Sequence, residues 1–197
     1  MLGTGTHEDI TAQLQGATHL HFACHGRFDT HSPLDSALYF AGEETLTLRD
    51  LLANTLDVSA ARLVVLSAYQ TGLTDFHNVP DGAVGFPAGF IQASVPGIVS
   101  TLWPVNDLST ALLLTRFYRH CLKDKLEPAA ALHKAQVWLR DSTAGELGLA
   151  GHYARLFQAS GRRDPRLYHT MRYHKVHPRC RPFTHAYYWA PFVFSGV

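Results

Sequence analysis

Two continuous apolar runs place the strongest constraint on the fold of this chain. Residues 62–68 read RLVVLSA, and residues 97–102 read GIVSTL. A strand with one wet face alternates apolar and polar residues, whereas a strand covered on both faces is apolar throughout. Strands of the second kind belong mostly to parallel sheets with helices on both sides. The two runs therefore predict a mainly parallel sheet that is covered on both faces.

Helical patterns follow both runs. Residues 81–93 have Asp81 at the position of an N-cap, and residues 106–122 carry apolar side chains at helical spacing with Asp107 in the first turn. Residues 127–140 have Pro128 at the first helical position, where proline is tolerated. Strands that alternate with helices predict one α/β domain over residues 1–197, with helices flanking the sheet.

Further strands are predicted nearer the two ends of the chain. Residues 18–24 (THLHFAC) alternate in polarity and are followed by His25 and Gly26, and residues 37–40 and 45–48 flank a hairpin turn. Residues 192–194 form a last short strand. Residues 144–184 are rich in Arg, His, Gly and Pro with weak periodicity, so we expect an irregular insertion there.

Charge and cysteine content exclude several classes of protein. The net charge is +1, which predicts neither a nucleic-acid nor a membrane partner. No run reaches the roughly 18 to 20 apolar residues of a membrane span, and no signal peptide is visible. The three cysteines are odd in number and widely spaced, which argues against a disulfide framework and predicts a reducing, cytoplasmic location.

A set of motifs in a fixed order resembles the CHAT domain, a caspase-like module often found with tetratricopeptide repeats. The motifs are HFACHG at 21–26, LVVLSA at 63–68, TG at 71–72, DGAVG at 81–85, STLWPVND at 100–107, AAALHKAQVWLR at 129–140 and YYWAPF at 187–192. The resemblance implies a caspase-like three-layer sandwich. It also implies that the chain begins late, without the first strand of the family's sheet, and belongs to a larger bacterial protein with repeats.

The resemblance further implies a site made by two strand ends. His25 matches the general acid/base histidine, and the backbone N–H groups of Gly26 and residue 69 match the oxyanion hole. The family places Cys and Glu where this chain has Tyr69 and Gln70. Gln70 and Asp81 are weaker candidates for contact with substrate, and Asp81 is better explained as an N-cap.

The residue types that could replace the missing thiol are few. Cys24 precedes His25 directly, so the two side chains point to opposite faces of a strand, and we expect Cys24 to be a small buried hydrophobe. Ser67 shares the face of Tyr69, but it lacks the glycine pattern of a nucleophile elbow and is expected to be a core or hydrogen-bonded serine. A displaced or partner-supplied nucleophile stays open as an alternative.

Histidines raise the question of a metal site. His19, His21 and His25 have even spacing and are predicted to lie on one strand face, and the tail carries His169, His174, His177, Cys180 and His185. The tail spacing matches no zinc motif, and strand histidines are more often hydrogen-bonded side chains than ligands. We therefore expect no metal and no cofactor, although a metal-binding module remains a third hypothesis.

Together these features predict an inactive relative of a cysteine endopeptidase. Its function would be regulatory, through a peptide or protein partner held in the blocked cleft or through an attached repeat region. The alternative is an active cysteine-type peptidase whose nucleophile is displaced or supplied by a partner.

Overall fold

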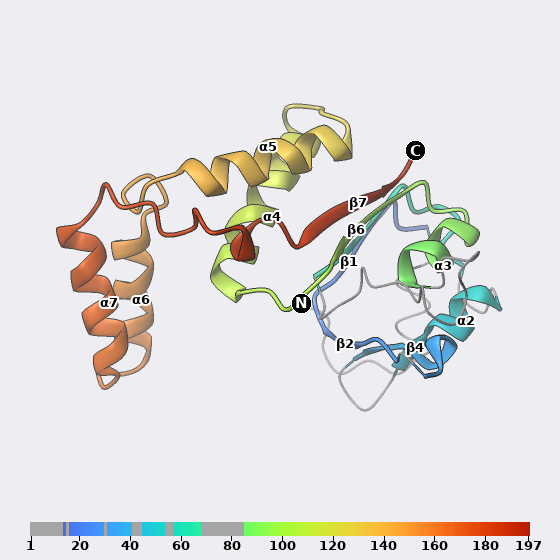
Figure 1. The fold of residues 1–197 in the computed structure, drawn as a ribbon, viewed down its shortest axis with the longest axis horizontal. Helices are drawn as coiled ribbons and strands as arrows, with labels where there is room; N and C mark the ends of the chain where they lie inside the picture. The colour runs from blue at the N-terminus through green and yellow to red at the C-terminus, as the bar shows by residue number, and fades with distance from the viewer. Residues whose placement is uncertain (1–13, 15, 30, 41–44, 54–56, 68–84) are drawn as a thin grey trace.

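A central four-stranded sheet organises the chain (Figure 1). The computed structural model describes residue 14 and residues 16–29, 31–40, 45–53, 57–67 and 85–197. The strands lie in the order β1-β5-β6-β7. The first three are parallel and β7 is antiparallel to β6. Their bounds are β1 His19–Phe22, β5 Leu63–Leu66, β6 Gly97–Thr101 and β7 Phe192–Gly196.

Strand β5 is buried along its whole length, as the apolar run predicted. Val64 and Leu66 belong to a first core cluster that includes Phe90. Leu63 and Val65 belong to a second core cluster that includes Phe117. Alternate side chains of one strand therefore enter two separate cores, which confirms an α/β structure with a mainly parallel sheet covered on both faces.

Two short helices cover the face of the first core cluster. They are α2 (Leu48–Leu52) and α3 (Phe86–Gln92). Thr47 and Asp50 form a reciprocal capping box at the start of α2. A Cβ atom at Gly89 of α3 would stand 2.6 Å from Leu48 Cδ1, so a larger residue there would require the Leu48 side chain to move.

Two long helices cover the opposite face. They are α4 (Asp107–Leu122) and α5 (Pro128–Asp141). Asn106 caps α4 by accepting a hydrogen bond from Ser109 N at 3.1 Å. Asp107 lies in the first turn, as predicted. Among the described residues, no helix is both long enough and apolar enough to span a membrane.

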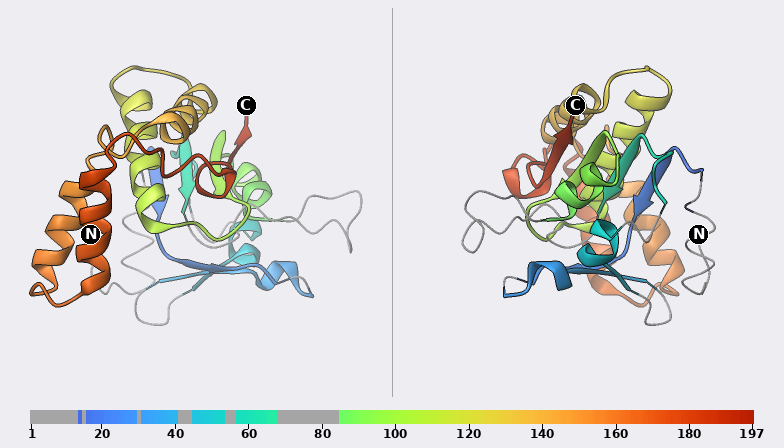
Figure 2. Two further views of the ribbon diagram at one scale, coloured as in Figure 1. Left: turned by 60° about the vertical axis from the view of Figure 1, so that its left-hand side comes forward. Right: turned by 90° about the vertical axis from the view of Figure 1, so that its right-hand side faces the viewer.

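A second, antiparallel sheet lies below the parallel one (Figure 2). Its strands are β2 (His25–Arg27), β3 (Ala37–Tyr39) and β4 (Thr45–Thr47), in that order. A short 3₁₀ helix, η1 (Pro33–Asp35), connects β2 to β3, and another, η2 (Ala186–Tyr188), precedes β7. The pairing of β3 with β4 confirms the predicted hairpin.

Three expectations about individual elements were wrong. The first strand is shorter than residues 18–24, and His25 starts β2, so His25 does not share a strand with His19 and His21. The N-cap of α3 is Gly85 and not Asp81. Asp81 itself lies outside the described residues.

The expectation of irregular structure over residues 144–184 was also wrong for most of the segment. It contains α6 (Leu149–Ala159) and α7 (Pro165–Val176), which lie side by side and project away from the sheet (Figures 1 and 2). Asp164 caps α7 and Pro165 opens it. The pair buries few side chains: the buried residues of the two helices are Leu149 and His174.

Packing of α3 against the sheet predicts a large effect of one substitution. Phe90 is fully buried and its ring lies 5.9 Å from that of Phe22. Phe90→Ala should lower the free energy of unfolding by about 3–5 kcal/mol. The neighbouring Ile91 is 48% exposed, so Ile91→Ala should cost less than about 1 kcal/mol. Urea unfolding followed by tryptophan fluorescence measures both, and equal losses would contradict this packing.

Candidate functional site

The carboxyl ends of β1 and β5 meet at one edge of the parallel sheet. Phe22, the last residue of β1, pairs in register with Leu66, the last residue of β5. Ser67 N donates a hydrogen bond to Phe22 O at 3.1 Å and extends the ladder by one step. The segments that leave both strands therefore start from the same level, which is where parallel sheets place their ligand sites.

His25 and Gly26 leave this edge on the β1 side. They lie on β2, where His25 pairs with Tyr39 and Gly26 pairs with Leu38. The His25 side chain is exposed and Gly26 is half-buried. Of the other predicted site residues, Tyr69, Gln70 and Asp81 lie outside the described residues. His25 thus begins β2 just beyond the end of β1, and its role as a general acid/base stays a prediction.

A second histidine forms a polar link across the same edge. His21 Nε2 lies 2.9 Å from Ser67 Oγ, so a side chain of β1 is joined to the residue that follows β5. The Ser67 hydroxyl also lies 3.5 Å from Phe22 O. This confirms the prediction that Ser67 is a hydrogen-bonded serine. The role of His21 was missed, although the motifs HFACHG and LVVLSA place both residues near the ends of adjacent strands.

Helix α4 supplies the third member of this polar group. The rings of His21 and Tyr118 are 5.7 Å apart. The protein around His21 desolvates its charged form and so lowers its pKa, although part of the ring stays exposed. Burial likewise raises the pKa of the Tyr118 hydroxyl. Both groups are therefore held neutral at pH 7, and the neutral imidazole forms one hydrogen bond with the Ser67 hydroxyl.

None of the three cysteines lies in the segment directly after β5, where the family resemblance predicts the nucleophile. Cys24 lies between β1 and β2, packs against the first core cluster and is half-buried, and burial raises its pKa to about 11. Cys121 lies on α4, and burial raises its pKa to about 11 as well. Cys180 follows α7, with Sγ 3.9 Å from His174 Nδ1. Cys24 was predicted to be a small buried hydrophobe. It does pack against the core, but its side chain is half-buried.

The histidines named as possible metal ligands are spread over different elements. Thr18 Oγ1 lies 3.0 Å from His19 Nδ1, and His21 is bonded to Ser67. In the tail, His174 is stacked on Tyr153 with ring centroids 5.6 Å apart. Within the described ranges, no three His, Cys, Asp or Glu side chains are grouped to hold a metal ion.

The end of β6 brings an aromatic pair to the same edge. Trp103 follows β6 closely and donates a hydrogen bond from Nε1 to Tyr187 O at 3.2 Å. Leu102 N donates to Pro191 O at 3.0 Å, so the chain before β7 is fastened to this end of the sheet. The motifs STLWPVND and YYWAPF therefore meet at this end of the sheet.

The lowered pKa of His21 predicts a pH dependence of stability. The unfolded chain binds a proton near pH 6.5, and the folded chain does so only at lower pH. The stabilisation is complete above pH 6.5 and is lost as the pH falls toward the folded pKa. His21→Gln removes the titration while retaining a partner for Ser67.

Urea unfolding at pH 7.5 and pH 5.5 compares the two proteins. The native protein should lose more stability between these pH values than His21→Gln does. His174, whose pKa is also lowered by burial, titrates in both proteins and cancels from the difference. Equal losses in the two proteins would show that His21 is not desolvated in the fold.

Comparison with known proteins agrees with the fold and the arrangement of the motifs. The family model described as CHAT domain matches residues 1–197. A comparison with curated proteins gives no significant match.

Proposed function

The chain belongs to the CHAT domain family, and we propose that it is a member without cysteine-peptidase activity that acts as a regulatory, peptide- or protein-binding module. The family is caspase-like, and the α/β fold is consistent with a peptidase scaffold. The proposal therefore concerns what the scaffold does in this chain. The bound partner would occupy the edge where β1 and β5 end.

The placement of all three thiols carries this proposal. A thiolate is the attacking species in cysteine peptidases, and active cysteines have a pKa at or below the usual 8.5. Burial shifts the pKa of Cys24 and Cys121 in the opposite direction, to about 11. Cys180 packs against the second core cluster on the other side of the sheet from Cys24. None of the three cysteines lies directly after β5. For Cys24 and Cys121, burial also disfavours the thiolate.

The Tyr69 hydroxyl is a poor replacement for a thiol nucleophile. Its unperturbed pKa of about 10 makes a phenolate scarcer at pH 7 than a thiolate, and its ring is much larger than a thiol. We propose that this ring fills the space of a scissile bond and hydrogen-bonds to His25. Gln70 replaces a family carboxylate, which removes a charge that could pair with a cationic substrate.

Cleavage of a peptide library, read by mass spectrometry, tests the proposal. Native protein should give no cleavage above background. Tyr69→Cys should restore sequence-specific cleavage, because the histidine and the backbone donors are retained. Tyr69→Cys combined with His25→Ala should lose that cleavage again by at least 100-fold, as expected for loss of a general base. Specific cleavage by the native protein would overturn the proposal.

A second candidate is a hydrolase with a displaced nucleophile. The 2.9 Å contact between Ser67 and His21 favours it, because a serine nucleophile requires an adjacent base. The hydroxyl, however, also faces Phe22 O, and the pair bridges two strand ends. A fluorophosphonate probe that labels native protein at Ser67, and fails to label His21→Gln, would establish this candidate in place of the first.

The proposed setting is the cytoplasm, in a larger protein that contains a repeat region. The support is limited to chemistry: Cys24, Cys121 and Cys180 are all unpaired, which suits a reducing compartment. The repeat region is inherited from the family resemblance.

A further inference from the structure

The charge of this chain is distributed very unevenly. Residues 149–185, which contain α6 and α7, include eight Lys or Arg residues and one acidic residue, whereas the net charge of the whole chain is +1. The prediction of no nucleic-acid partner rested on the net charge of the whole chain, which hides this local excess of positive charge. The helical pair carries a strong local positive charge and projects from the domain (Figure 1).

Most of these cations have no acidic partner. Arg166 lies 3.5 Å from Asp164, and Arg181 interacts electrostatically with Asp141 and Glu146. The other six form no ion pair with any described residue: Arg155, Arg162, Arg163, Arg172, Lys175 and Arg179. Like charges at helical i,i+3 spacing destabilise a helix, and Arg172 and Lys175 of α7 have this spacing. A polyanionic partner would remove that cost.

The outward face of α7 combines these charges with aromatic rings. Its buried or half-buried positions follow one side of the helix, at residues 167, 170, 171 and 174. The other side exposes cations and rings in alternation: Arg166, Tyr168, His169, Arg172, Tyr173 and Lys175. No acidic residue lies within α7. Solvation of the charges alone does not explain the exposed tyrosines on this side of the helix.

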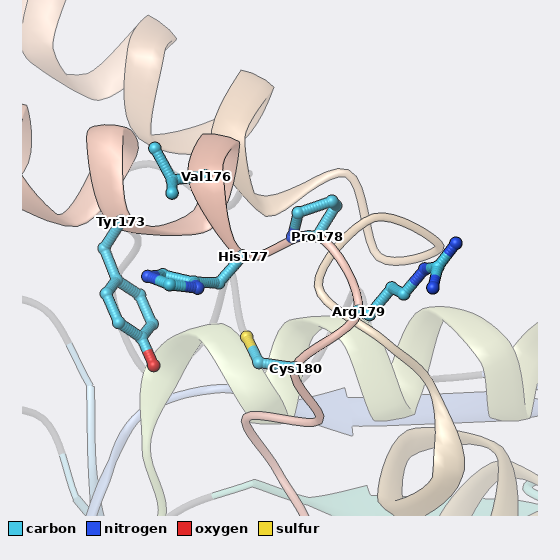
Figure 3. A pocket seen from close by; sticks show the side chains of 6 residues that line it. All are labelled: Tyr173, Val176, His177, Pro178, Arg179 and Cys180. Atoms are coloured by element: carbon cyan, nitrogen blue, oxygen red, sulfur yellow. The ribbon is translucent and has the colours of Figure 1, made fainter.

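A small pocket continues this face beyond the end of α7. It has a volume of about 420 Å³ and is lined by Tyr173, Val176, His177, Pro178, Arg179 and Cys180. The rings of Tyr173 and His177 lie together on one side of it, 4.7 Å apart, and the Arg179 guanidinium extends from the other (Figure 3). Tyr173 is 54% exposed, so its ring is accessible to a planar ligand.

We propose that α7 and the pocket at its end bind single-stranded nucleic acid. Phosphates would lie along Arg172, Lys175 and Arg179, and an unpaired base would stack on Tyr173 beside His177. Duplex bases are already stacked and offer no such face. A membrane surface is disfavoured because Val176 is the only large aliphatic side chain on the exposed side of α7, and interfacial helices need a broad apolar face. This surface is separate from the edge where β1 and β5 end.

Fluorescence anisotropy with a labelled 20-nucleotide oligouridylate tests the proposal with the full chain. If about four phosphates are neutralised, affinity should fall roughly 50-fold between 50 and 200 mM salt. Arg172→Ala/Lys175→Ala should reduce the slope of log K against log salt by about 1.4. The matched control Lys123→Ala/Lys134→Ala removes two exposed cations, one from the C-cap of α4 and one from α5, and should leave the slope unchanged.

Tyr173 separates stacking from charge. Tyr173→Ala should weaken binding about tenfold without changing the salt slope, and Tyr173→Phe should bind like the native protein. Circular dichroism confirms that each variant is folded.

Several outcomes would overturn the proposal. These are no binding by native protein at 50 mM salt, equal losses in the two double variants, and binding that is insensitive to Tyr173→Ala. Equal or tighter binding of a duplex, of polyglutamate or of phosphatidylserine vesicles would also overturn it and identify the polyanion that these cations bind.

Discussion

The two-sided burial of β5 is the constraint on which the rest of the structure depends. Val64 and Leu66 face one core, and Leu63 and Val65 face the other. A strand of this kind is stable only with helices on both sides and with hydrogen-bonded strands at both edges, since its backbone groups are removed from water. The order β1-β5-β6 and the helical layers follow from that requirement.

The same constraint builds the candidate site. Because β1 and β5 are parallel and in register, the residues that follow them emerge at one edge without any special loop geometry. His21 and Ser67 join the two ends by a hydrogen bond, and His25 then leads into the second sheet. The function that we propose differs from a peptidase by one side chain after β5. A change of that side chain leaves the strands that build this edge intact.

The sequence predicted the fold well where burial imposes a pattern, as in β5, the β3–β4 hairpin and α4. It failed where burial is slight. Helix α7 is mostly polar and buries a single side chain, so its periodicity is weak. His25 was placed on the first strand because alternation cannot show where a chain leaves one sheet for another. The contact of His21 with Tyr118 joins residues distant in sequence and needed the packing of α4 to be seen.

The most direct measurement of the central claim is the pKa of a thiol introduced at the nucleophile position. The rate of iodoacetamide alkylation of Tyr69→Cys would be followed against pH, with each cysteine resolved by peptide mass spectrometry. We predict a pKa for this thiol below 8.5 that returns to the ordinary range when His25→Ala is added, because an adjacent imidazolium stabilises a thiolate. The same pKa in both variants would contradict the claim that the chain retains a peptidase scaffold that lacks only its nucleophile.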